Sequence, residues 1–499
     1  MYYTSTRGRA DRVSFAQAVS RGIAPDGGLY VPDHFPTVTR EELAELGKLS
    51  YSQLAAEIIS LFATDFSDEE TDMCVARAYD SGRFPKEDPA PVKKLNSVLS
   101  VLELWHGPTC AFKDMALQIL PAFMITSKKE LGDNTETVIL TATSGDTGKA
   151  ALEGFKDVPG IRVIVFYPED GVSLVQQYQM TTQEGGNVSV IAVEGNFDDA
   201  QTGVKRIFTD TGFAARLEKK GIRLSSANSI NWGRLLPQIV YYFHGYLEMA
   251  AQKTISLGER INICVPTGNF GNILAAYYAA KMGLPVNRLI CASNENNVLT
   301  DFIHTGTYDS NRKFCTTISP AMDILVSSNL ERLVYDMTEC DAEAVSGYMD
   351  ALKKEGLYTV DSRTAGNIQN MFWAGFADRE ETLETIGQVY AEYDYLADPH
   401  TAVGMAVYSR YRADTGDNTQ TLLASTASPF KFNRSVSGAV FGSAVADSMS
   451  EFTLLDYLSE KTGLEVPGSL SGLNKKEIRH KDRCAPKDME DKVAEILGL

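Results

Sequence analysis

The chain has 499 residues, of which 44% are hydrophobic and 22% charged, an ordinary globular composition in a chain too long for one compact core. Its 47 basic and 65 acidic residues give a formal net charge of −18, which argues against nucleic acid as a partner. No apolar run approaches the roughly 20 residues that span a bilayer, and the first residues lack the apolar core of a signal peptide. We therefore expect a cytoplasmic protein with no membrane partner.

The seven cysteines are odd in number and widely spaced, and no two form a CxxC pair. A disulfide framework and a structural zinc site are therefore not expected, and no metal is predicted. Cys264 and Cys291 lie in apolar runs and are predicted to be small core residues. Cys110 is also expected to pack, because no motif pairs it with a base.

Residues 1–95 are predicted to be mainly helical. Residues 40–46 and 52–59 both place apolar side chains at helical spacing. The segment 84–91 contains three prolines, which remove hydrogen-bond donors and disfavour regular structure. We expect a boundary there.

Beyond this boundary the pattern alternates between strands and helices. One predicted helix covers 198–217, with Asp198 as its N-cap, and residues 330–395 are predicted to be a helical, acidic insertion. Such alternation predicts an α/β fold with a mostly parallel sheet covered by helices on both faces. The predicted strands are the short apolar runs at 138–142, 163–167, 188–193, 261–265, 289–292 and 421–424.

The first motif that carries chemistry is the segment 106–114, His-Gly-Pro-Thr-Cys-Ala-Phe-Lys-Asp. Lys113 lies beside Ala111 and Phe112 in a turn-rich segment, so we expect partial burial, which disfavours the ammonium form. A neutral amine is what a Schiff base with a carbonyl cofactor requires. On this motif alone, an ordinary surface lysine is the simpler interpretation.

Two glycine-containing turns follow predicted strands and precede predicted helices. The segment 143–148, Thr-Ser-Gly-Asp-Thr-Gly, suits a carboxylate or phosphate, and equally an ordinary helix cap. In the segment 266–272, Pro-Thr-Gly-Asn-Phe-Gly-Asn, Gly268 and Gly271 allow the backbone to wrap closely around an anion. Its spacing is neither that of a Walker loop nor that of a dinucleotide fingerprint, which indicates a single small phosphate.

Two further segments add polar groups. The segment 226–234 combines amides, a hydroxyl and Arg234, whose guanidinium is suited to a phosphate; a capped helix start with a solvated arginine is the alternative. Thr426 follows the last predicted strand, where hydroxyls face the ligand crevice of open α/β sheets. His106 and His400 are expected to support neighbouring site residues or the fold, and not to be catalytic.

The ordered combination HGPT-x-AFKD, TSGDTG, SANSIN-x-x-RL and PTGNFGN resembles the threonine synthase family, within the tryptophan-synthase-β-like (fold type II) class of pyridoxal-phosphate enzymes. The N-terminal segments 14–19 and 27–32 are similar to the longer bacterial and fungal-type branch. The resemblance runs from about residue 2 to about residue 435. It implies two open, mostly parallel sheet domains flanked by helices, with the cofactor between them, after a mainly helical N-terminal segment. The implied ranges are 1–95 for that segment, 96–130 and 225–499 for a large cofactor-binding domain, and 131–224 for a small α/β domain.

The resemblance also implies a role for each site residue. Lys113 would hold pyridoxal 5′-phosphate as a Schiff base, Thr426 would face its pyridine nitrogen, and Asp146 would lie near its 3′-oxygen. The cofactor phosphate would be bound by Gly268, Asn269, Phe270, Gly271 and Asn272. The substrate carboxylate and phosphate would be held by Ser144, Thr147, Asn228, Ser229 and Arg234. Ser428 departs from the family, because relatives often have His at this position.

The implied reaction converts O-phospho-L-homoserine and water to L-threonine and phosphate, the last step of threonine biosynthesis, in a monomer or homodimer. A related pyridoxal-phosphate lyase, such as a threonine or serine dehydratase or a cysteine synthase, is the nearest alternative. The second anion-binding segment disfavours it, because dehydratase substrates carry no phosphate. A catalytically inactive paralogue that binds phosphorylated ligands is a further alternative, and the loop spacing disfavours a nucleotide-binding protein.

Overall fold

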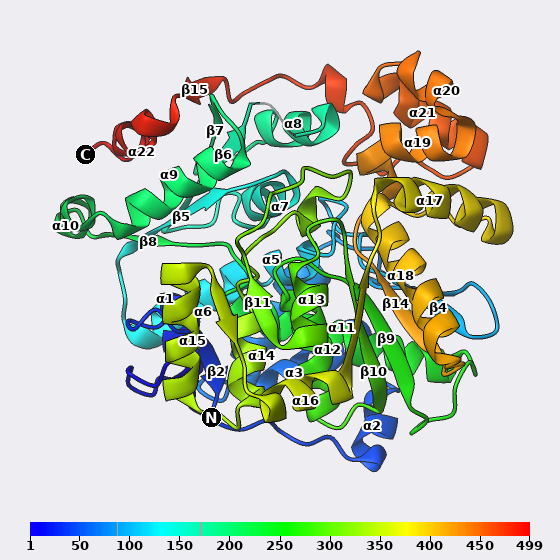
Figure 1. The fold of residues 1–499 in the computed structure, drawn as a ribbon. Helices are drawn as coiled ribbons and strands as arrows, with labels where there is room; N and C mark the ends of the chain where they lie inside the picture. Colours follow the sequence, from blue (N-terminus) through cyan, green and yellow to red (C-terminus); the bar gives the residue numbers. More distant parts are fainter. Residues whose placement is uncertain (87, 170–171) are drawn as a thin grey trace.

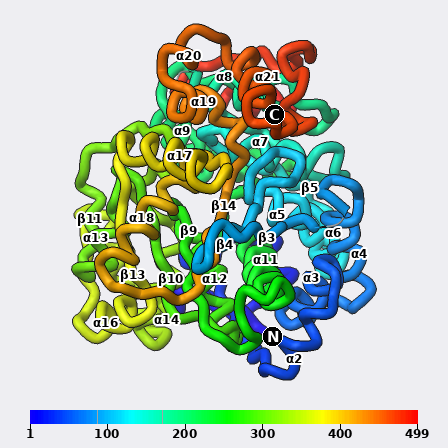
Figure 2. The backbone as a smooth tube through the Cα atoms, turned by 90° about the vertical axis from the view of Figure 1, so that its right-hand side faces the viewer, coloured from blue at the N-terminus to red at the C-terminus, as the bar shows by residue number. Residues whose placement is uncertain are grey.

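The computed structural model describes residues 1–86, 88–169 and 172–499. Glu87, inside the predicted boundary segment 84–91, lies outside the described residues. The chain forms two helix-flanked sheets, with the smaller one above the larger one in Figure 1. The N-terminus lies at the end of the molecule that carries the larger sheet, and the C-terminus lies at the other end (Figure 2).

The larger sheet has six strands in the order β13-β10-β9-β14-β4-β3, and all are parallel except β3. Its central strands β9, β14 and β4 are buried along their length, which explains why the sequence carries apolar runs at β9 and β14. The strands are β3 (Val92–Lys94), β4 (Leu99–Glu103), β9 (Ile261–Pro266), β10 (Val286–Ser293), β13 (Phe372–Phe376) and β14 (Thr421–Ser425).

The smaller sheet has five parallel strands in the order β15-β7-β6-β5-β8. They are β5 (Glu136–Ala142), β6 (Ile161–Pro168), β7 (Val188–Val193), β8 (Ile222–Ser225) and β15 (Asp482–Cys484). Its helices are α7 (Asp146–Gly154), α8 (Leu174–Thr181), α9 (Phe197–Thr209), α10 (Thr211–Lys219) and, from the chain end, α22 (Met489–Leu497).

The N-terminal region is mainly helical, with one two-stranded sheet formed by β1 (Tyr3–Ser5) and β2 (Tyr30–Pro32). A serine or threonine caps each of the four helices and forms a reciprocal capping box with the third helical residue, which fixes where each helix begins. These helices are α1 (Phe15–Arg21), α2 (Arg40–Leu46), α3 (Tyr51–Ser60) and α4 (Asp68–Tyr79).

Most other helices surround the larger sheet. Its core helices are α5 (Asp114–Leu117), α6 (Leu120–Leu131), α11 (Trp232–Ala251), α12 (Gly271–Lys281), α13 (Val298–Thr305) and α18 (Pro399–Thr415). The predicted insertion contains α14 (Leu330–Met337), α15 (Ala342–Glu355), α16 (Ser362–Met371) and α17 (Arg379–Tyr393), and β12 (Leu357–Thr359) pairs with β11 (Thr307–Asp309). Towards the C-terminus follow α19 (Asn433–Phe441), α20 (Ser443–Asp447) and α21 (Glu451–Thr462). Four short 3₁₀ turns complete the elements: η1 (Pro320–Met322), η2 (Pro429–Phe432), η3 (Leu473–Lys475) and η4 (Pro486–Asp488).

The predicted α/β class and all six predicted strands are confirmed, and four local expectations are wrong. The region 330–395 is not purely helical, because β13 completes one edge of the larger sheet. Asn196, not Asp198, caps α9, and the predicted helix 198–217 is interrupted where Asp210 caps α10. The strand β15 pairs with the smaller sheet although it lies in the range 225–499, because α22 packs its apolar face onto that sheet's core.

Within the described part of the chain, no helix is long and apolar enough to cross a membrane, and no group of His, Cys, Asp and Glu side chains is arranged to hold a metal ion. All seven cysteines are free. Cys264 and Cys291 are fully buried between apolar neighbours, as predicted. Burial raises the pKa of the Cys110 thiol to about 11, which keeps it protonated and unreactive at neutral pH.

Candidate active site

Lys113 lies on a turn that is fastened to the end of a sheet strand. We call residues 106–114 the lysine turn; it leaves β4 and leads into α5, with Lys113 immediately before the first helical residue. The Phe112 N–H donates to the Thr426 carbonyl over 2.8 Å, next to an isolated bridge between Ala111 and Ala427. The lysine is therefore fixed at the carboxyl edge of the larger sheet, between β4 and β14.

The environment of Lys113 favours its neutral form. The residue is only 8% exposed, and burial lowers the pKa of its ammonium group to about 8. Asp146, with its Oδ2 3.8 Å from Lys113 Nζ, opposes this shift, whereas the positive charges of Arg234 and Lys431 add to it. About a tenth of the amine is therefore unprotonated at pH 7, far more than for an ordinary lysine.

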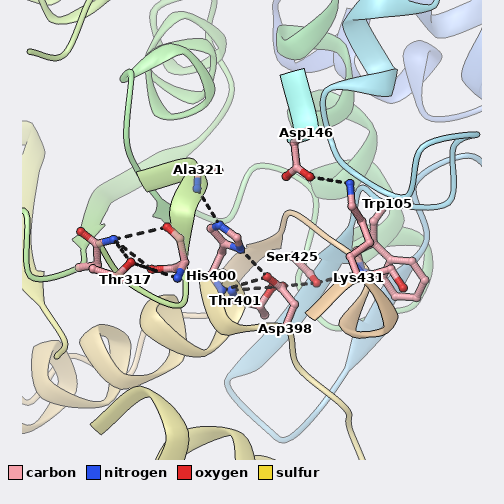
Figure 3. Close-up of polar contacts among 12 residues, drawn as sticks. Trp105, Asp146, Thr317, Ala321, Asp398, His400, Thr401, Ser425 and Lys431 are labelled. Atoms are coloured by element: carbon pink, nitrogen blue, oxygen red, sulfur yellow. Dashed lines mark hydrogen bonds and ion pairs between the residues drawn. The ribbon is translucent and has the colours of Figure 1, made fainter. Parts of the chain in front are cut away.

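Asp146 is the first residue of α7 and lies between two lysines. Its Oδ1 accepts a hydrogen bond from Lys431 Nζ at 2.5 Å (Figure 3). The same oxygen accepts from Gln176 Nε2 at 2.9 Å. Burial alone would raise the pKa of Asp146, but Lys431 and then Lys113 hold it well below its usual range. The carboxylate is therefore ionised and oriented.

The segment 266–272, which we call the glycine loop, joins β9 to α12. Phe270 adopts a left-handed conformation (φ 62°), and α12 begins at Gly271, so the first N–H groups of that helix have no acceptor within it. A Cβ on Gly268 would lie 2.7 Å from the Ala321 carbonyl oxygen, so no side chain fits there. Such a helix start suits an anion.

Asn272 provides a buried donor beside this loop. The hydroxyls of Tyr241 and Tyr242 both donate to Asn272 Oδ1 at 2.6 Å, which fixes the orientation of the amide. The amide nitrogen Nδ2 is buried and has no hydrogen-bond partner among the described residues. An unpaired buried donor is costly, so this nitrogen is suited to a ligand acceptor.

Arg234 is a buried cation without a carboxylate partner. It is 4% exposed; Nη1 donates to the Ala227 carbonyl, and Nε has no partner among the described residues. Within the same residues, no acidic side chain comes within 4.0 Å of its guanidinium. Burial lowers the pKa of Arg234 to about 10, so it remains charged at neutral pH and can bind an anion.

One cavity brings most of the predicted site residues together. It also includes His400, which was expected to be structural, and three residues that the sequence did not indicate: Gln238, Ala321 and Met322. Asp146 lies next to Lys113 without lining the cavity, and Ser144 is not among the lining residues. The predicted residues that line it are Lys113, Thr147, Asn228, Ser229, Arg234, Thr426 and Gly268, Asn269, Phe270, Gly271 and Asn272.

His400 holds one wall of the cavity in place. Its Nδ1 lies 2.8 Å from Asp398 Oδ1, and its Nε2 accepts from the Ala321 N–H at 3.2 Å, which is the pattern of a neutral imidazole protonated at Nδ1 (Figure 3). Thr401 connects Asp398 to Ser425 Oγ, 3.0 Å from Thr401 Oγ1, at the end of β14. The imidazole therefore anchors η1 to α18.

Ser428 occupies the position where the resemblance expects a histidine. Its side chain accepts a hydrogen bond from the Phe430 N–H at 3.4 Å and caps η2. The η2 turn carries Lys431, whose ammonium reaches Asp146. Ser428 therefore stabilises the η2 turn, which positions Lys431.

Comparison with known proteins gives consistent matches along the chain. Residues 2–79 match the threonine synthase N terminus, 86–362 the pyridoxal-phosphate dependent enzyme family, and 401–491 the threonine synthase C-terminal family. The chain is 41% identical to threonine synthase of Pseudomonas aeruginosa over 447 residues, which is 89% of this chain and 92% of that protein.

Solved structures agree with the sequence matches. A PLP-bound threonine synthase of Brucella melitensis superimposes with a TM-score of 0.87 at 36% identity, covering 99% of both chains. Threonine synthase from yeast superimposes with a TM-score of 0.88 at 33% identity, covering 100% of this chain and 99% of that one.

Proposed function

The chain belongs to the threonine synthase family of pyridoxal-phosphate dependent enzymes, and from this premise we propose that it converts O-phospho-L-homoserine and water to L-threonine and phosphate. The observation that carries the choice of a phosphorylated substrate is Arg234, a buried guanidinium with no carboxylate partner among the described residues. A dehydratase substrate carries no phosphate to pair with this cation.

The residues present fit the cofactor, pyridoxal 5′-phosphate. Lys113 supplies a buried amine with a lowered pKa, suited to holding an aldehyde covalently. The glycine loop, the start of α12 and the unpartnered Asn272 Nδ2 suit its phosphate. We propose that Gly268, Asn269, Phe270, Gly271 and Asn272 bind this phosphate, and that Thr426 contacts the pyridine nitrogen.

A second anion site is proposed for the substrate. Asn228, Ser229 and Arg234 line the cavity at the start of α11, and Thr147 lines it from α7. We propose that Arg234 binds the substrate phosphate, since a guanidinium can donate two parallel hydrogen bonds to it. Ser144 and Thr147 are proposed for the substrate carboxylate, since they lie at the start of α7 and that helix end favours a negative charge.

Protons are moved by the chain's own groups. Lys113 Nζ, neutral above a pKa of about 8, is the proposed base that accepts the proton from the substrate α-carbon. The cofactor, when bound, supplies a ring that takes up the negative charge developing at that carbon. A hydroxyl such as Thr426 at the pyridine nitrogen would leave that nitrogen largely neutral.

The later steps concern the substrate's β- and γ-carbons. A β-proton is lost as the γ-phosphate leaves. Protonation at Cγ, addition of the water oxygen at Cβ and return of a proton to Cα then give threonine. Arg234 would hold the departing phosphate in the site, where its second pKa near 6 allows it to take up or release a proton. Cytoplasmic location, the domain ranges other than the corrected C-terminal residues, and the state of monomer or homodimer stay predictions.

The test is an end-point assay of purified protein with pyridoxal phosphate and O-phospho-L-homoserine. L-Threonine is scored by mass and chirality, and phosphate release is measured in parallel. Equal amounts of L-threonine and phosphate are expected. Phosphate with 2-oxobutyrate would contradict the proposal and indicate a lyase that fails to add water at Cβ, and no product would indicate another substrate.

A further inference from the structure

Lys431 is a fully buried cation outside the substrate cavity. Its side chain is 0% exposed, and it reaches inward from η2. Its Nζ donates to Asp146 Oδ1 at 2.5 Å (Figure 3). It also donates to the Thr109 carbonyl at 3.0 Å. Because an unpaired buried charge is very costly, Lys431 and Asp146 depend on each other.

The carboxylate of Asp146 lies between two ammonium groups at unequal distances. Lys431 Nζ is 2.5 Å from Oδ1, whereas Lys113 Nζ is 3.8 Å from Oδ2. Lys113 is therefore the weaker partner. When Lys113 gives up its proton, Asp146 still has a counter-ion in Lys431, so the neutral amine does not leave a lone carboxylate in the interior.

We propose that Lys431 is a positioning residue of the active site, which acts through Asp146 to let Lys113 exist as a neutral amine at neutral pH. This inference rests on the proposed function of Lys113. It assigns to η2 a role in preparing the lysine for its cofactor. Lys431 itself does not line the cavity.

The titratable and polar groups around Lys113 and Asp146 come from several elements. Lys113 is faced by Asp146 from α7, Arg234 from α11, Lys431 from η2 and Asp114 from α5. Asp146 is additionally faced by His400 from α18, and Gln176 of α8 donates to it. Among these described groups, Lys431 is the one whose ion pair with Asp146 is shorter than the ion pair between Lys113 and Asp146.

This arrangement determines whether removal of Lys431 raises or lowers the pKa of Lys113. With Lys431 present, deprotonating Lys113 leaves a neutral Lys431–Asp146 pair. Without Lys431, deprotonation of Lys113 leaves the buried Asp146 carboxylate with no cation beside it, so Lys113 should keep its proton to higher pH. The direct repulsion between the two lysines is lost as well, which acts in the same direction.

The test measures the amine of Lys113 without turnover. Full-length, cofactor-free protein is acetylated briefly with acetic anhydride across a pH series, and the Lys113 peptide is quantified by mass spectrometry. The wild type should show a midpoint near pH 8. Lys431→Met and Lys431→Gln should both raise this midpoint by about one pH unit or more, because each removes the charge.

Lys149→Met is the matched control. Lys149 is another buried lysine of the smaller domain, paired with Glu153 at 3.1 Å and with Gln183, and it does not face Asp146. Its removal should leave the Lys113 midpoint unchanged. A wild-type midpoint in Lys431→Gln would overturn the proposal, because that variant keeps a hydrogen-bonding group without the charge.

A third variant keeps the proposal testable if both Lys431 variants misfold, as judged by circular dichroism. Asp146→Asn removes the carboxylate and keeps Lys431, so the Lys113 midpoint should fall below that of the wild type. An unchanged midpoint in Asp146→Asn would refute the link between the two lysines. Because labelling requires no substrate, failure here is distinguishable from failure of the protein to form threonine.

Discussion

The backbone N–H of Phe112 donates to the carbonyl of Thr426 over 2.8 Å, although the two residues are far apart in the sequence. This bond, with the adjacent Ala111–Ala427 bridge, attaches the lysine turn to the end of β14. The Asp114 carboxylate also accepts from the Thr109 N–H and hydroxyl, both at 2.7 Å, which closes the turn. The position of Lys113 is therefore set by the sheet.

Lys113→Ala should leave this turn intact and remove only the amine. We expect pyridoxal phosphate to bind without a covalent bond, and threonine formation to fall by at least about a thousandfold, because the proposed base and anchor are lost together. Borohydride reduction followed by mass spectrometry would check the loss of the covalent bond. Substantial threonine formation by this variant would be incompatible with the assignment.

The pH dependence of cofactor uptake follows from the lowered pKa of Lys113. Only the neutral amine attacks an aldehyde, so the rate of covalent pyridoxal-phosphate incorporation should rise about tenfold per pH unit below a pKa of about 8. Above it the rate should level off. Stopped-flow absorbance of the cofactor-free protein mixed with pyridoxal phosphate would measure this profile, and a rate still rising tenfold per unit at pH 9–10 would indicate an unshifted lysine.

Arg234→Met should raise KM for O-phospho-L-homoserine by about 10-fold to 100-fold, because one or more hydrogen bonds to a charged phosphate are lost at about 1.5–3 kcal/mol each. The affinity for pyridoxal phosphate should stay near that of the wild type. Steady-state kinetics and a cofactor titration would separate the two effects. Arg223→Met serves as the control, because it removes a guanidinium on β8 that pairs with Asp133. An unchanged KM in Arg234→Met would contradict the phosphate role.

The parts of the fold that could be predicted from sequence are those with a local signal. Buried parallel strands need continuous apolar runs, and all six predicted runs are strands. The β13 strand was missed because its five residues follow directly on a helix, and β15 because Asp482–Cys484 is short and polar. Both strands lie at a sheet edge, where pairing partners distant in sequence decide the structure.

The site could be predicted where neighbouring residues in the sequence form it. The glycine loop is such a case, because its glycines and amides follow one another directly between a predicted strand and a predicted helix. Lys431 was missed because its partner Asp146 is 285 residues away. One local signal was available: Lys431 lies between Phe430 and Phe432, just as Lys113 follows Ala111 and Phe112, and a lysine in such surroundings is expected to be buried.

Gly268→Ala tests whether cofactor binding depends on the close approach of the glycine loop to η1. An added Cβ would lie 2.7 Å from the Ala321 carbonyl oxygen and 3.1 Å from Met322 Cα, and both are backbone atoms that cannot rotate away. The loop or η1 must shift, which typically costs about 1–3 kcal/mol. We therefore expect the dissociation constant for pyridoxal phosphate to rise by about tenfold or more.

Gly366→Ala provides the matched comparison, because a Cβ on this glycine of α16 would meet nothing within 4 Å. This change should leave cofactor binding unaltered and stabilise the helix by about 0.5–1 kcal/mol. Fluorescence titration with pyridoxal phosphate and thermal unfolding would measure both variants. If Gly268→Ala bound the cofactor as tightly as Gly366→Ala, the loop would not depend on the absence of a side chain at this position, and its proposed role as the phosphate cradle would lose its main geometric support.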